Sequence, residues 1–146
     1  MDIFQILKKE HDQVKSLMNQ MLSKKESKAD DLMRQIHKEL SVHMQGEEKL
    51  FYPMLEEDDS SREKALEGYE EHHVAKGVLK ELQKMNHADE RWMAKVSVLK
   101  EIVEHHVEEE EKELFKAAKG VFEKEEVKEI GKKYLEEKER MMSSMK

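Results

Sequence analysis

Histidine and glutamate recur in this sequence at a spacing that suits metal binding. Two segments place a histidine four residues before a glutamate, His43 before Glu47 and His106 before Glu110. Residues i and i+4 of a helix share one face and lie about 6 Å apart along its axis, so both side chains can reach one metal ion or two neighbouring ions. The chain of 146 residues contains eight histidines and no cysteine. This composition excludes disulfides, iron–sulfur clusters and thiolate zinc sites, and favours Fe, Mn or Zn bound by imidazole and carboxylate.

Each of these pairs has a further histidine upstream at a similar distance. His11 lies 32 residues before the histidine of the first pair, and His72 lies 34 residues before that of the second. The residues 3, 6, 7 and 10 positions after His72 are all apolar, as they are after His11, whereas those after His73 include two lysines and a glutamine. His72 is therefore the residue of the tandem that is expected to face a core. The same comparison favours His106 over His105.

Helices are expected to carry these side chains, because apolar residues recur every three or four positions along the chain. Five helical segments are expected, at about residues 2–24, 27–57, 60–85, 90–119 and 123–142. Asp2 is a candidate N-cap for the first, and Ser60 with Glu63 forms a candidate capping box for the third. Pro53 is expected to kink the second segment or begin its last turn, and Gly120 to end the fourth.

Four long amphipathic helices with short connections favour an all-α fold, an up-down-up-down antiparallel four-helix bundle with a short fifth C-terminal helix. We expect a single domain over residues 1–146, with a bundle core at about 2–119 and the C-terminal helix at about 123–142. On the expected helices the apolar stripes continue through the histidines and glutamates. Polar groups at such core positions cost free energy unless they are paired or bind a metal.

The charge of the chain argues against several classes of partner. The 27 basic and 34 acidic residues leave a net charge of −7, which opposes a general affinity for nucleic acid or for anionic membranes. The sequence contains neither the apolar run of a secretory signal nor the roughly 20 apolar residues that span a membrane. We therefore expect a soluble, cytoplasmic protein.

These motifs resemble those of the hemerythrin-like domain family, also called the HHE cation-binding domain, over nearly the whole chain. The residues that carry the resemblance are His11 with Asp12, Glu71-His72, His43…Glu47-Glu48 before Phe51-Tyr52-Pro53, and His106…Glu110-Glu111 before Leu114-Phe115. The resemblance implies a non-haem di-iron centre inside a four-helix bundle, two Fe ions joined by an oxo or hydroxo group and by two bridging carboxylates. The metal ligands it implies are His11, His43, Glu47, His72, His106 and Glu110.

The sequence departs from the oxygen-carrying members of this family at one point. Those proteins take two histidines from the third helix at positions i and i+4, whereas Lys76 lies four residues after His72 and Gly77 four residues after His73. Of about twelve positions around two octahedral irons, the expected ligands and bridge fill about ten. The implied site is therefore open at about two positions, unless His73, His105, Glu111 or Lys76 fills one.

An open site of this kind favours inner-sphere reactivity toward a small diatomic or peroxide ligand over simple reversible binding of O₂. The resemblance implies a protein that binds O₂, another small oxidant or NO for sensing, scavenging or storage. An enzyme that acts on peroxide or NO would use the same site, as would an iron-responsive module in which metal binding controls folding and a contact with a protein partner.

Other interpretations of these residues fit less well. A ferritin-like site needs two Glu-x-x-His motifs, and only Glu70-x-x-His73 is present. The His-Glu-x-x-His motif of zinc proteases is absent. A purely structural bundle would have to place four histidines and two glutamates on core stripes by chance. His37 lies off the apolar stripe of its segment and His87 lies in an expected loop, so neither is expected to bind metal.

Overall fold

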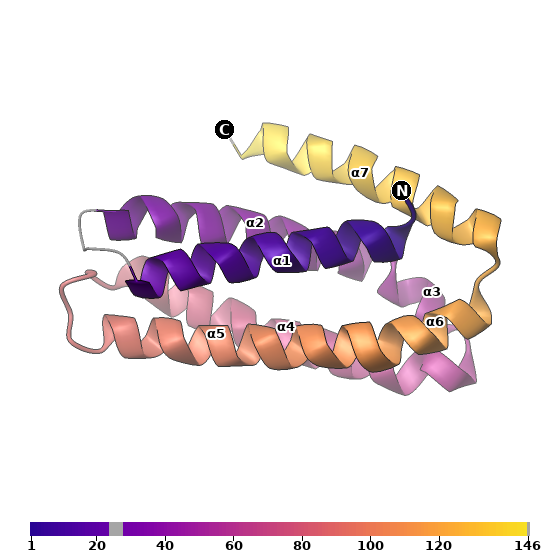
Figure 1. Ribbon diagram of the computed structural model, residues 1–146, viewed down its shortest axis with the longest axis horizontal. Coiled ribbons are helices and arrows are strands. Elements are labelled where there is room, and N and C mark those ends of the chain that lie inside the picture. The colour runs from indigo at the N-terminus through magenta and orange to yellow at the C-terminus, as the bar shows by residue number, and fades with distance from the viewer. Residues whose placement is uncertain (24–27, 146) are drawn as a thin grey trace.

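The computed structural model describes residues 1–23 and 28–145, and this part of the chain is helical without strands (Figure 1). The elements are α1 (Ile3–Ser23), α2 (Ala29–Leu50), α3 (Tyr52–Glu56), α4 (Asp59–Lys84), α5 (Trp92–Glu109), the π-helical turn η2 (Glu110–Leu114), α6 (Phe115–Val121) and α7 (Lys124–Ser144). The expected all-α class is confirmed. The structure differs from the expected single additional helix, because α3, η2 and α6 are separate elements and α7 has 21 residues.

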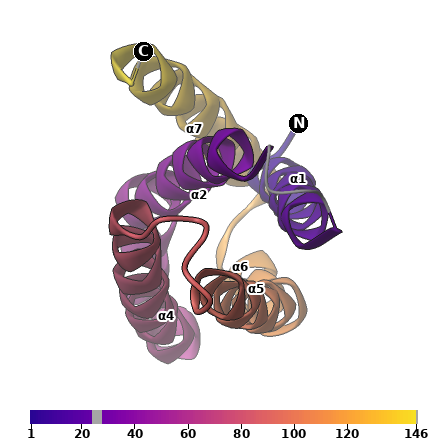
Figure 2. The same cartoon turned by 90° about the vertical axis from the view of Figure 1, so that its left-hand side faces the viewer.

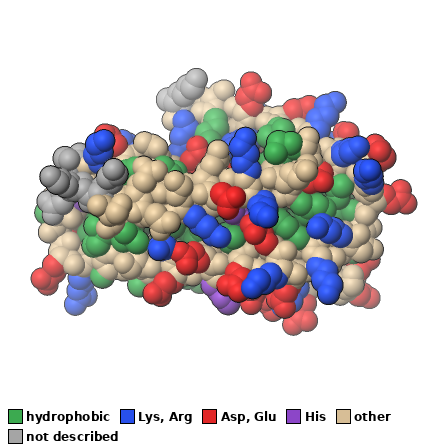
Figure 3. Space-filling model, in the orientation of Figure 1, with side chains coloured by type: hydrophobic (Ala, Val, Ile, Leu, Met, Phe, Trp, Pro, Cys, Tyr) green, Lys and Arg blue, Asp and Glu red, His purple; other side chains and the backbone are tan. Residues whose placement is uncertain are grey.

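Four long helices surround the site. Helices α1, α2, α4 and α5 run side by side, and each runs in the direction opposite to its predecessor in the chain (Figure 1). They lie at four corners when the molecule is viewed along their axes, and α7 lies outside these corners, packed against α1 and α2 (Figure 2). Charged side chains of both signs are interspersed over the face shown in Figure 3.

The expected second segment is two helices, α2 and α3, because Pro53 interrupts it. Proline has no N–H to donate, and its ring clashes with the carbonyl four residues earlier in a continuous helix. The chain bends at Phe51, and Pro53 lies in the first turn of α3. Tyr52 begins this short helix and is fully buried, so the break determines where its side chain lies.

Two expected helix ends are wrong and one is confirmed. Asp58 rather than Ser60 caps α4, since the Asp58 carboxylate accepts a hydrogen bond from the Ser60 backbone N–H. Gly120 does not end the fourth segment. It lies within α6, which continues to Val121, and no glycine of the described residues has a positive φ. Asp2 does cap α1, as its carboxylate accepts from the Gln5 backbone N–H at 2.9 Å.

The helix that begins at Trp92 widens at η2. The Phe115 N–H donates to the Glu110 carbonyl five residues earlier, which defines a π-helical turn. The wider turn allows Glu110, Leu114 and Phe115 all to be buried. Such turns are frequent at functional sites, and this one begins at an expected metal ligand.

Two hydrophobic clusters lie on either side of a polar layer. One cluster takes Val14 from α1 and Leu40 from α2, and the other takes Leu7 from α1 and Phe51 from α2. His11 lies between the two clusters along α1, where it is buried. None of the described helices combines the length and apolar character needed to cross a bilayer.

Candidate metal centre

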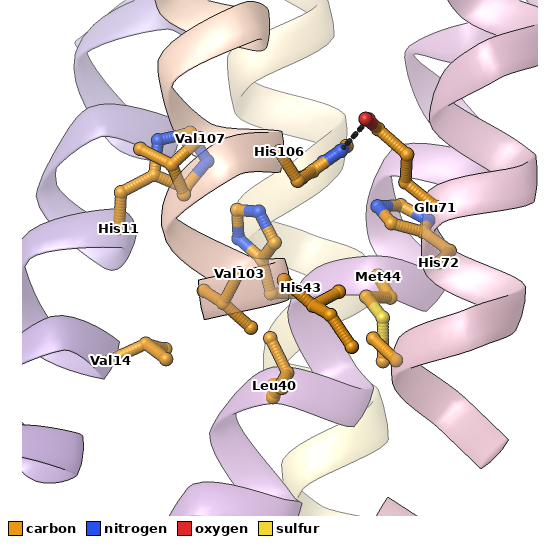
Figure 4. Close-up of a pocket in the computed structure, with 12 residues that line it drawn as sticks. His11, Val14, Leu40, His43, Met44, Glu71, His72, Val103, His106 and Val107 are labelled. Carbon is orange, nitrogen blue, oxygen red and sulfur yellow. Dashed lines mark hydrogen bonds and ion pairs between the residues drawn. The ribbon is translucent and has the colours of Figure 1, made fainter. Parts of the chain in front are cut away.

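The structure brings all six expected ligands together in this polar layer. The side chains of His11, His43, Glu47, His72, His106 and Glu110 are buried, and they come from α1, α2, α4, α5 and η2. The four imidazoles face a common space between the helices (Figure 4). Because i and i+4 residues share a helix face, Glu47 and Glu110 reach the same layer as His43 and His106.

Their inward-pointing atoms form two adjoining groups that share one carboxylate. The first group contains His11, His43, Glu47 and Glu110, whose candidate ligand atoms all lie within 4.8 Å of one another. His11 Nε2 lies 3.1 Å from Glu110 Oε1, and His43 Nε2 lies 3.2 Å from Glu47 Oε1. Atoms this close can bind one cation, since metal–nitrogen and metal–oxygen distances are about 2.0–2.2 Å.

The second group contains Glu47, His72 and His106. His72 Nε2 lies 3.0 Å from Glu47 Oε1, and His106 Nε2 lies 3.8 Å from the same oxygen. Glu110 Oε2 lies 3.1 Å from His106 Nε2, so both glutamates extend from the first group to the second. Glu47 and Glu110 are therefore placed to bridge two ions.

Buried polar atoms without hydrogen-bond partners indicate that these residues fit a metal. Within the described residues, such atoms are His11 Nε2, His43 Nε2, Glu47 Oε2 and Glu110 Oε1. All four belong to the first group. A buried polar atom without a partner costs free energy, and a bound cation would satisfy all four at once.

Each of the four imidazoles is hydrogen-bonded to a carboxylate on a helix other than its own. The pairs, measured from Nδ1 to the nearest carboxylate oxygen, are His11–Glu111 at 2.7 Å, His43–Glu10 at 2.8 Å, His72–Glu48 at 2.7 Å and His106–Glu71 at 2.6 Å. An ionised carboxylate only accepts hydrogen bonds, so each Nδ1 donates its proton and each Nε2 faces the centre. Partners of this kind orient metal-binding histidines and make them more basic.

Neighbouring carboxylates hold the imidazoles of His11, His43 and His106 toward their charged form when no metal is bound. Burial lowers the pKa of an imidazole, but Glu47 and Glu10 raise the pKa of His43 to about 10. In the same way Glu110 and its neighbours raise the pKa of His11 and His106. Burial raises the pKa of the Glu47 carboxyl, but His43 and the other hydrogen-bond partners lower it well below its ordinary value.

Tyr52 places a hydroxyl against the candidate ligand atoms. Its ring stacks on His72 at 5.2 Å between centroids, as the Phe115 ring stacks on His11 at 6.3 Å. Only Tyr52 carries a hydroxyl, which donates to Glu110 Oε2 at 2.5 Å and lies 3.3 Å from His106 Nε2. Burial and the neighbouring carboxylates raise the pKa of this hydroxyl well above 10.0, so it keeps its proton.

The four residues considered as extra ligands lie outside the centre. The His73 side chain is exposed, and Lys76 pairs with Glu48 at 2.8 Å near the surface. His105 is 66% exposed, with its Nε2 3.5 Å from Glu109 Oε1. Glu111 accepts from His11 Nδ1 rather than facing the metal groups.

Sequence reasoning missed several residues of the centre. Tyr52, Glu10 and Glu71 were not singled out for their contacts, although a glutamate directly precedes both His11 and His72 and a second glutamate directly follows Glu47 and Glu110. Asp12, which carried part of the family resemblance, is exposed. The residue beside His11 that contacts the site is Glu10, which is buried.

A small cavity lies beside the four imidazoles. Its volume is about 20 Å³, and the residues lining it include His11, His43, His72 and His106. Away from the imidazoles its wall is mostly apolar, formed by side chains such as Val14, Leu40, Met44, Val103 and Val107 (Figure 4). A space of this size holds about one water-sized molecule.

Comparisons with known proteins also indicate a cation-binding domain. The family model of the hemerythrin HHE cation-binding domain matches residues 2–118. The crystal structure of a hemerythrin HHE cation-binding domain-containing protein from Mycobacterium kansasii superposes with a TM-score of 0.88 at 22% sequence identity, covering 99% of this chain and 89% of that one. At this low sequence identity, the similarity shows only that the two proteins share a fold. A search of the curated proteins gave no match.

Proposed function

Because the chain belongs to the hemerythrin HHE cation-binding domain family, we propose that it is a non-haem di-iron protein that binds O₂, another small oxidant or NO. The observation that carries the proposal is the pair of adjoining His/carboxylate groups that share Glu47. Under this proposal, two Fe ions are held by His11, His43, Glu47, His72, His106 and Glu110. The proposed role is sensing, scavenging or storage of the small ligand.

Iron bound in these groups would supply redox and Lewis-acid chemistry toward a small ligand. The residues of the chain would orient the metal ligands and limit access to the site. The carboxylates on Nδ1 keep the imidazoles oriented, and the apolar side chains around the cavity exclude bulk water. The cavity of about 20 Å³ fits a ligand of two or three atoms better than a larger organic substrate.

Metal analysis of freshly purified protein, produced with added iron, tests the proposal directly. About two irons per chain, together with near-ultraviolet and visible charge-transfer absorption, are expected. Cycles of reduction and exposure to O₂ or NO should then change this spectrum reversibly. Protein that contains no iron, or a single zinc ion per chain, would contradict the di-iron proposal while leaving the helical fold intact.

Tyr52 favours a second candidate, an enzyme that acts on peroxide. Its hydroxyl proton lies beside the ligand atoms of His72, His106 and Glu110, and the raised pKa of the hydroxyl keeps that proton in place. A hydroxyl that keeps its proton is a positioned hydrogen-bond donor, which can stabilise the charge that develops on oxygen as a peroxide O–O bond breaks. Sustained consumption of hydrogen peroxide over many turnovers by the iron-loaded protein would select this candidate.

A further inference from the structure

Helix α7 lies beyond the residues matched by the family model, yet it contacts the candidate metal centre. We infer that Tyr134 and Lys138 of α7 position Glu10 and, through Glu10, the His43 imidazole. The C-terminal helix then controls one of the two proposed metal positions and leaves the other alone. This inference rests on the proposed function as a metal protein.

The contacts form a continuous chain from α7 to the ligand. The Tyr134 hydroxyl donates to Glu10 Oε1, and Lys138 Nζ donates to Glu10 Oε2 at 2.7 Å. Glu10 Oε1 also accepts from His43 Nδ1 at 2.8 Å. Both oxygens of the carboxylate are therefore held, one by the imidazole and the tyrosine and the other by the lysine.

Close packing places Tyr134 where it can make this contact. A Cβ atom added at Gly46 of α2 would lie 2.5 Å from Tyr134 Cε2, so the ring packs directly over the α2 backbone one residue before Glu47. A Cβ at Gly131 would lie 2.9 Å from the Met1 carbonyl oxygen, so α7 also packs against the N-terminal backbone. Two glycines thus allow α7 to approach α2 and the start of α1.

The equivalent carboxylate on the other side of the centre lacks this cover. Glu71 holds His106 as Glu10 holds His43, but its side chain is 23% exposed, compared with 6% for Glu10. Another titratable neighbour of Glu71 is His105, at 3.6 Å, whose side chain is largely exposed. Of these two carboxylates, only Glu10, which holds His43, is contacted by Tyr134 and Lys138 of α7. His43 belongs to the group of ligand atoms that contains the buried atoms without partners.

Substitutions in the full-length chain can separate this role from simple docking of α7. Tyr134→Phe removes the hydroxyl and keeps the ring, and Lys138→Met removes the charge and keeps the length. Lys49→Met is the matched control, because Lys49 Nζ also joins α7 to the four long helices, through Glu137 Oε1 at 2.9 Å, without contacting Glu10. Lys138→Arg restores a donor and should restore the wild-type behaviour.

Titration of the metal-free chain with Co²⁺, followed by its visible absorption against a competing chelator, provides the readout. The wild-type chain is expected to bind two Co²⁺ ions. Tyr134→Phe and Lys138→Met should each weaken one of them by about tenfold and leave the other unchanged, because loss of a partner behind a ligand costs 10–100-fold in affinity. Lys49→Met should leave both unchanged.

A double-mutant cycle shows whether the effect passes through Glu10. In a Glu10→Gln background, Lys138→Met should add no further weakening, because the two substitutions act on one contact. In proton NMR spectra of the Co²⁺ protein, Lys138→Met should move one shifted, exchangeable Nδ1–H signal, the same signal that Glu10→Gln moves.

The possible failures are distinguishable. A wild-type chain that binds no Co²⁺ would overturn the proposed function and this inference together. A wild-type chain with two Co²⁺ ions, in which Lys138→Met and Lys49→Met behave alike at both positions, would overturn this inference alone. Additive effects of Lys138→Met and Glu10→Gln would also overturn it.

Discussion

The polar layer is built from one small unit that is used four times. In each unit an imidazole directs Nε2 to the centre and donates from Nδ1 to a carboxylate on another helix. None of these imidazoles can rotate without breaking its Nδ1 hydrogen bond to a carboxylate, and leaving a buried partner unsatisfied costs about 1–3 kcal/mol. The centre is therefore preorganised in the metal-free chain, and single side chains can be tested against it.

Glu47 is the residue whose loss should disturb the centre most, because it belongs to both groups of ligand atoms. We expect Glu47→Ala to lose both metals and Glu110→Ala to disrupt both positions, since each would remove a bridge. His73→Ala removes an exposed imidazole next to His72 and should keep most of the metal. Metal analysis of the three purified variants checks the prediction, and full loading of both glutamate variants would contradict it.

Tyr52→Phe should affect chemistry more than metal content, because Phe115 occupies the matching place over His11 without a hydroxyl. The variant is expected to keep its iron and to consume peroxide at least about tenfold more slowly, since loss of one positioned hydrogen-bond donor costs about 10²–10³-fold. Steady-state assays at equal iron content measure this. An unchanged rate would remove the argument for an enzymatic role that rests on this hydroxyl.

Among the elements, the breaks in the helices matter as much as the helices. Both segments that carry a His-x-x-x-Glu motif depart from regular α-helix near the glutamate, one at Phe51 before Pro53 and the other at η2, which begins at Glu110. These departures bury an aromatic side chain five residues after each glutamate, Tyr52 in one case and Phe115 in the other. Regular helices alone would not provide both the ligands and the rings stacked on them.

Packing of α7 on α2 can be tested with two glycine substitutions that have opposite expected signs. Gly46→Ala forces its Cβ against Tyr134 and should destabilise the fold by about 1–3 kcal/mol. Gly77→Ala, on an exposed face of α4 with no atom within 4 Å of its Cβ, should stabilise it by about 0.5–1 kcal/mol. Urea denaturation curves give both values. Equal effects of the two substitutions would argue against close packing of α7.

For the molecule as a whole, the centre balances charge between imidazolium and carboxylate when no metal is bound. Raised pKa values of His11, His43 and His106 supply positive charge beside the buried Glu47, whose pKa is lowered. The metal-free chain can therefore fold, and a bound metal would displace these protons and give partners to the four buried atoms that lack one.

Removal of metal should still lower the stability of the folded chain considerably. A metal that binds only the folded state, at a free concentration 1,000 times its dissociation constant, contributes about 4 kcal/mol. For a chain of this size two such ions correspond to a fall in Tm of more than about 10 °C on chelation. Thermal unfolding followed by circular dichroism, with metal content verified, measures the change. Identical melting curves with and without metal would contradict the prediction and the iron-responsive module.

The metal-free chain should be most stable between about pH 4.5 and 6.5, the ordinary pKa values of Glu and His from which these groups shift. The lowered pKa of Glu47 contributes stability that is present above about 4.5 and is lost as the pH falls through its folded value. The raised pKa of His43 contributes stability that is present below 6.5 and is lost as the pH rises toward about 10. Urea midpoints measured across this range check both limbs, and a maximum above pH 8 would contradict the assignment.

The sequence by itself determined which side chains face the core, because helical periodicity is local. The i, i+4 spacing selected His43 with Glu47 and His106 with Glu110, and the apolar neighbours selected His72 over His73, whose side chain is exposed. That these residues bind iron stays a proposal. The helix class and most helix boundaries follow from the same short-range pattern.

Only the tertiary structure decided which carboxylate holds each histidine and which residues contact that carboxylate in turn. Glu10 and Glu71 act on histidines of neighbouring helices, and Tyr134 reaches Glu10 from 124 positions along the chain. Such contacts depend on the rotation and axial offset of packed helices, which spacing within one helix does not specify. The position of the Tyr52 hydroxyl likewise depends on tertiary structure. Pro53 predicts a break in the helix, but packing decides that the Tyr52 side chain enters the centre.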